Sequence, residues 1–124
     1  MLIIVNSILI GLVALIGFLG GMNLMLKGAM KFLPKETPPQ PILDNLVRFL
    51  SGIYFGAGFL FAYAAFNVGT LGDVVYFLGL IVLFSGLGRL FSRIKIGSAG
   101  QYFDIIMFVE IILGLAIITL QWFS

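Results

Sequence analysis

The sequence contains no cysteine and no histidine among its 124 residues. Without cysteine there can be no disulfide and no thiolate metal site. Without histidine the commonest metal ligand and the usual general base are absent. Much redox and hydrolytic chemistry is therefore closed to this chain acting alone. We expect no catalytic residue, no metal site and no cofactor, and an enzyme is the third of the functions considered, after the two given at the end of this section.

Charged residues are scarce as well, at 10% of the sequence against about 25% in soluble proteins. Hydrophobic residues make up 61%, and the mean hydropathy is +1.20. Twelve charged side chains, five acidic and seven basic, cannot cover a soluble domain of this length. Membrane lipids are therefore the expected surroundings of most of the exterior. The net charge of +2 is too small to indicate a nucleic-acid partner.

Four stretches reach the roughly 20 apolar residues that a helix needs to cross a bilayer. The first begins at Leu2 with no basic segment before it and exceeds the length of a signal sequence, so we interpret it as a retained span. Thr70 and Asp73 form a variant capping box that predicts the start of the third helix. We expect an all-α integral membrane four-helix bundle, a single domain over 1–124, with spans at about 2–30, 42–66, 71–91 and 102–123.

The basic residues are distributed unevenly along the chain. All seven lie in or beside the first and third connections, and neither the second connection nor the C-terminal end has any. In a four-span chain the first and third connections share one side of the membrane. The positive-inside rule therefore predicts that these two connections are cytoplasmic and that both termini lie outside.

Glycine is abundant inside the expected spans, with sixteen residues in the whole chain. Gly17 and Gly21 are four apart in the first span, Gly52 and Gly56 are four apart in the second, and Gly86 lies in the third. Small residues at such positions let helix backbones approach closely in lipid. Two interpretations are open: packing within the bundle, or a surface for a partner helix or a second copy.

Arg48, Arg89 and Glu110 are ionisable residues placed inside the expected spans, and this topology puts them in the cytoplasmic half. A charge inside a span is costly, so we expect Glu110 to find a cation among the two arginines. Asn23 and Lys27 add polar groups at the same level. One interpretation is a structural ion pair that fixes helix register. The other is a cytoplasm-facing pocket for an anionic headgroup or small metabolite, with Glu110 as a proton carrier.

Two short segments and one residue inside the expected spans carry a family resemblance: Arg48–Tyr54 (RFLSGIY), Gly86–Leu90 (GLGRL) and Glu110. They resemble an uncharacterised family of small bacterial four-helix integral membrane proteins, a domain of unknown function that is distantly similar to the DoxX-like proteins. Some DoxX-like proteins are small subunits of membrane oxidoreductases. The resemblance implies the fold and a location in the bacterial inner membrane.

These observations favour a small non-catalytic membrane protein, an accessory or structural subunit that packs in a larger inner-membrane complex. The alternative is a binding or transport module. It would hold a lipid, quinone or other hydrophobic molecule near Arg48, Arg89 and Glu110.

Overall fold

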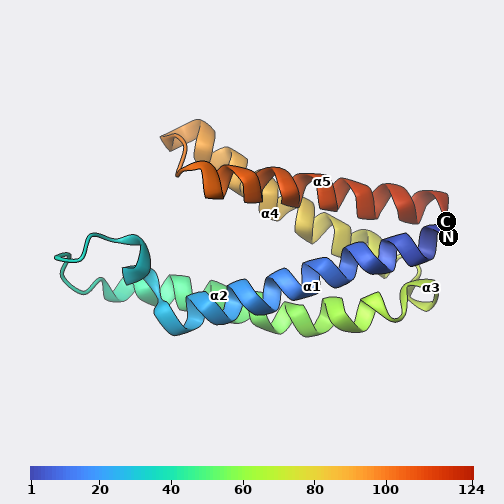
Figure 1. The fold of residues 1–124 in the computed structure, drawn as a ribbon, viewed down its shortest axis with the longest axis horizontal. Coiled ribbons are helices and arrows are strands. Elements are labelled where there is room, and N and C mark those ends of the chain that lie inside the picture. Colours follow the sequence, from blue (N-terminus) through green and yellow to red (C-terminus); the bar gives the residue numbers. More distant parts are fainter. The chain divides into compact units, whose positions relative to one another are not determined.

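The computed structural model describes all residues from Met1 to Ser124 and is all-α, without a strand (Figure 1). Four of its helices are long and apolar enough to cross a membrane, which confirms the expected fold class and makes the chain a multi-pass membrane protein. Short helical turns occupy two of the connections. The elements in order are α1 (Leu2–Lys27), the 3-10 helix η1 (Ala29–Phe32), α2 (Pro41–Ala65), α3 (Val68–Leu71), α4 (Val74–Ile96) and α5 (Gln101–Phe123).

Two helices end at a different residue from the one expected. The first helix stops at Lys27 instead of about residue 30, because Gly28 turns to a positive φ of 67°. The second of these helices is α4, which continues to Ile96, five residues beyond the expected end at 91. Arg93 and Lys95 lie in its last turn, where cations meet the negative end of the helix dipole, and Gly97 with φ 116° then ends the helix.

The capping box expected before the third span does not form. Asp73 is the residue before α4, but its side chain makes no capping hydrogen bond and its backbone is already helical. Thr70 instead donates its hydroxyl hydrogen bond to the carbonyl oxygen of Asn67, 3.0 Å away. The reason is α3, a single helical turn that takes Thr70 into its own hydrogen bonds and moves the start of α4 to Val74.

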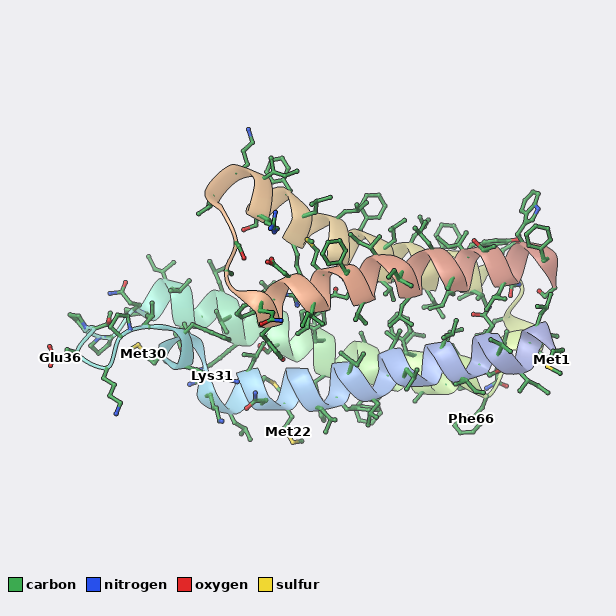
Figure 2. The ribbon with its side chains drawn as sticks, turned by 45° about the horizontal axis from the view of Figure 1, so that its top comes forward. Met1, Met22, Met30, Lys31, Glu36 and Phe66 are labelled. Atoms are coloured by element: carbon green, nitrogen blue, oxygen red, sulfur yellow. The ribbon has the colours of Figure 1, made fainter.

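The chain divides into two compact units, one of residues 11–63 and one of residues 1–10 with 64–124. The first unit, called here the α1–α2 hairpin, contains most of α1, η1 and nearly all of α2. Lys31 and Glu36 lie in the connection between its two helices (Figure 2). The second unit contains the start of α1, the end of α2, and α3, α4 and α5.

Glycines bring the backbones of α1 and α2 together in the α1–α2 hairpin. A Cβ atom added at Gly21 would lie 2.7 Å from the amide nitrogen of Phe55 and 2.9 Å from the carbonyl oxygen of Ser51. One added at Gly17 would lie 3.0 Å from the carbonyl oxygen of Tyr54. Such atoms belong to the partner backbone and cannot move aside, so only glycine allows this approach.

An aromatic cluster of three phenylalanines packs beside these glycines. The ring of Phe18 meets those of Phe55 and Phe59 edge to face, with centroids 5.5 and 4.8 Å apart, and the last two rings meet each other in the same way at 5.5 Å. This geometry sets the positive edge of one ring on the negative face of another. The cluster fixes the register of α1 against α2.

The second unit is held by the antiparallel pair α4 and α5, called here the α4–α5 hairpin. A Cβ atom added at Gly114 would lie 2.5 Å from the amide nitrogen of Leu83. One added at Gly86 would lie 2.9 Å from the amide nitrogen of Ile111. Around these contacts lie the buried side chains of Val75, Leu78, Val82, Met107 and Ile117.

Both chain ends lie at one end of this unit (Figure 1). The side-chain amide of Asn6 in α1 is buried and donates a hydrogen bond to the carbonyl oxygen of Ile117 in α5, 3.3 Å away. The side-chain amide of Gln121 donates to the carbonyl oxygen of Gly72, just before α4, at 3.1 Å. The N-terminus, the C-terminus and the connection into α4 therefore share one end, opposite the connection between α4 and α5.

The close approach at Gly86 predicts that even one methyl group there destabilises the protein. Gly86→Ala forces the added Cβ against Ile111, and overpacking of this kind costs about 1–3 kcal/mol. Gly88→Ala is the matched control, because an added Cβ there meets nothing within 4 Å. Thermal unfolding in detergent should show a lower midpoint for the first variant alone. Equal midpoints would contradict the packing described for α4 and α5.

Candidate functional site

The α4–α5 hairpin carries an ion pair between two charges that lie inside membrane-spanning helices. The Nε of Arg89 donates a hydrogen bond to Oε1 of Glu110 at 2.6 Å, and the two side chains are 33% and 13% exposed. The pair is possible because Gly86, one turn before Arg89, holds α4 against α5. The guanidinium of Arg89 also lies 6.0 Å from the ring centroid of Phe103, within range of a cation–π contact.

A second ion pair follows one turn closer to the connection. The Nε of Arg93 donates to Oδ1 of Asp104 at 3.2 Å, and the hydroxyl of Ser98 donates to the other carboxylate oxygen at 2.7 Å. The backbone amide of Gly100 in turn donates to the Ser98 hydroxyl oxygen at 3.1 Å. Glycines with positive φ at both ends of this connection, Gly97 and Gly100, allow the tight turn that places Ser98 over α5.

Three of these four charged side chains, Arg89, Arg93 and Asp104, line a cavity of about 150 Å³ at the connection end of the hairpin. Its polar lining comes from both arginines, from Asp104 and from Ser92. Phe103 and Met107 form its apolar side. Because Arg89 and Arg93 are four residues apart on α4, their guanidinium groups project from the same face of that helix. The cavity therefore combines two cations, a carboxylate, a hydroxyl and an aromatic ring.

A family model for a domain of unknown function, DUF4345, matches residues 5–121, almost the whole chain. The chain belongs to the DUF4345 family. No curated protein and no solved structure matches it. The match confirms the expected uncharacterised family, and it spans every helix that builds the cavity.

In this DUF4345 domain Arg48 has partners of its own within the α1–α2 hairpin. Its Nε donates to Oδ2 of Asp44 at 2.7 Å, and its Nη1 donates to the carbonyl oxygen of Met25 at 2.7 Å. The other oxygen of Asp44 accepts the backbone N–H of Ala29 at 3.0 Å. A Cβ atom at Gly28 would overlap the Asp44 carboxylate. Arg48 and Asp44 thus fasten the end of α1 to the start of α2.

The five residues expected to form one polar cluster belong to two different units, with Asn23, Lys27 and Arg48 in one and Arg89 and Glu110 in the other. Glu110 binds Arg89, whereas Arg48 binds Asp44 four residues before it on the same helix. Asn23 and Lys27 lie on the last two turns of α1, and neither side chain makes a hydrogen bond or ion pair within the chain. The structure holds no group of three or more His, Cys, Asp or Glu side chains that could bind a metal.

The expected packing glycines differ in what surrounds them. Gly17, Gly21 and Gly86 lie against the backbone of the neighbouring helix in their own unit. A Cβ atom added at Gly52 would only touch the sulfur of Met25, at 3.7 Å. Around Gly56 there is nothing within 4 Å.

Sequence reasoning did not select Arg93, Asp104 and Ser98 as site residues. Arg93 was assigned to a connection because the third span was expected to end near residue 91. One signal could have found it: Arg89 and Arg93 have the four-residue spacing of a helix face, and Asp104 lies in the first turn of the next span. A connection of four residues, 97–100, brings these ends together.

The Arg89–Glu110 pair predicts a stability loss in Glu110→Gln. The change removes the negative charge but keeps the side-chain shape, and a hydrogen bond between charged groups contributes about 1.5–3 kcal/mol. We expect normal membrane insertion and a lower unfolding midpoint in detergent. The double variant with Arg89→Gln should lose less than the sum of the two single variants, because both remove the same interaction. Additive losses would show that the two side chains do not interact.

Proposed function

We propose that this DUF4345 protein is a non-catalytic accessory subunit that docks against a helix of another membrane protein through an open face of α2. The observation that carries the proposal is what surrounds each of the packing glycines. Gly17, Gly21 and Gly86 lie against the chain's own backbone, while Gly56 is exposed and has no neighbour within 4 Å. Gly52, one turn earlier, is only half-buried.

The side of α2 around these two glycines also carries exposed apolar side chains. Phe49 and Ile53 follow that side and are both more than half exposed. A four-residue glycine pair between larger side chains lets the backbone of another helix approach closely. Without a hydrophobic drive between helices in lipid, such close contact is the main source of association.

The distribution of mass supports the same proposal. The four long helices hold most of the chain, and the connections between them, at 28–40, 66–73 and 97–100, are short. They leave little room for a soluble catalytic site. The resemblance to DoxX-like proteins, some of which are small subunits of membrane oxidoreductases, agrees with an accessory role in a bacterial inner membrane.

The proposed orientation places both termini outside and the connections after α1 and α4 in the cytoplasm. It rests on the basic residues, all of which lie in or beside those two connections. The shared end of the N-terminus, the C-terminus and the connection into α4 supports it, because these segments carry no basic side chain.

A second candidate function is a binding module for a lipid, quinone or other hydrophobic molecule. The cavity at the α4–α5 connection favours it, since a pocket with two arginines has no necessary part in docking through α2. The two functions use different helices and can be tested separately.

Single-cysteine labelling tests the orientation without interference, because the chain has no cysteine of its own. In intact cells a membrane-impermeant thiol reagent should label Ser124→Cys, whose site is at the outer end. The control variant Glu36→Cys, in the connection between α1 and α2, should react only after the membrane is permeabilised. Labelling in the opposite order would overturn the orientation.

Purification from native membranes in mild detergent tests the accessory role. The unchanged protein should elute in a larger complex, and Gly56→Leu should elute free because the added side chain blocks close helix contact. Gly88→Leu, at another glycine with an open environment, is the matched control and should stay in the complex. Elution of the unchanged protein as a monomer with bound lipid would favour the second candidate instead.

A further inference from the structure

We propose that the cavity at the α4–α5 connection binds the phosphodiester group of a monoanionic membrane phospholipid. The inference rests on the second candidate function, a binding module, and gives its ligand. It concerns one hairpin and the residues Arg89, Ser92, Arg93 and Phe103 that line its cavity.

The donors in the cavity suit a phosphate. Each guanidinium carries five N–H donors, and the hydrogen bonds to Glu110 and Asp104 use the Nε of each arginine. The terminal nitrogens remain as a planar fork, which is the geometry that phosphate oxygens accept. Ser92, three residues after Arg89 on the same helix face, adds a hydroxyl donor.

The carboxylates hold the arginines in place and leave their terminal nitrogens available to an anion. Asp104 is fixed by both Arg93 and Ser98, so the guanidinium of Arg93 is held at a defined position before a ligand arrives. An arginine held in this way loses less side-chain freedom on binding than an unrestrained one. The two ion pairs thus prepare the site for an anion.

The charges at the cavity favour a monoanion over a dianion. Arg89 and Arg93 are balanced by the carboxylates of Glu110 and Asp104. A phosphodiester therefore adds one negative charge, which the terminal nitrogens of both arginines share. A dianion would add a second negative charge in a site that is partly shielded from water.

The cavity volume sets the size of the bound group. At about 30 Å³ for each water molecule, 150 Å³ holds about five waters or a group of that size. A phosphodiester fits, whereas a whole lipid does not. Phe103 and Met107 form the apolar side of the cavity, against which the first part of the lipid beyond the phosphodiester can lie.

Lipid binding to the purified full-length protein in an uncharged detergent tests the proposal. Native mass spectrometry would compare short-chain phosphatidylglycerol with the diacylglycerol of the same chain length, which lacks the phosphate. We expect the first to bind and the second not to bind measurably. Equal binding of the two would overturn the proposal, because the phosphate would then contribute nothing.

Variants assign the binding to the cavity. Arg93→Gln should weaken phosphatidylglycerol binding about tenfold, as expected for the loss of a charge-assisted hydrogen bond. Lys95→Gln removes the same charge two residues further along the helix, at a side chain that does not line the cavity. It should change phosphatidylglycerol binding less than about twofold. Equal effects of the two would show a general attraction to anions and would overturn the site.

Three further measurements cover the remaining outcomes. Ser92→Leu fills the cavity and leaves both ion pairs in place, so it should abolish binding even if Arg93→Gln does not fold. Inorganic phosphate added at equal concentration should not displace the lipid; displacement would identify a free-phosphate site and overturn the lipid source. Gly56→Leu should bind phosphatidylglycerol normally, so that failure of the accessory role and failure of this site give different results.

Discussion

Close backbone contact at glycine is the constraint on which the rest of this structure depends. In lipid, neighbouring helices gain little from hiding apolar surface, because the acyl chains are as apolar as the side chains. They associate where their backbones can touch, and Gly21, Gly86 and Gly114 provide those points within each hairpin. The contact at Gly86 also decides the chemistry nearby, since it brings Arg89 within hydrogen-bond distance of Glu110 one turn away.

The high cost of a charge in lipid explains how the ionic side chains are arranged. Each of the three arginines finds a carboxylate within its own hairpin: Arg48 with Asp44, Arg89 with Glu110, and Arg93 with Asp104. Local pairing satisfies each of these charges within a single hairpin, without a contribution from the other one.

The sequence predicted the features of this fold that depend on the average composition of long segments. Four spans and the cation for Glu110 follow from the length of the apolar runs and the cost of an unpaired charge. Helix ends depend on single backbone angles, such as the positive φ of Gly28 and of Gly97, which composition does not reveal. The missed site residues follow from this: once α4 reaches Ile96, Arg93 lies on a helix opposite Asp104 instead of in a connection.

Gly56 on α2 is one of the helical glycines, with Gly20 and Gly88, around which this hairpin packing places nothing within 4 Å. A glycine inside a helix costs about 1 kcal/mol relative to alanine, and the cost is offset where a second backbone fills the space. At Gly86 that backbone is present, whereas at Gly56 it is not. An alanine at Gly56 would cost the isolated chain nothing in packing and would improve its helix. In the proposed accessory role, the gain from glycine at this position comes from a partner helix that approaches α2 as closely as α5 approaches α4.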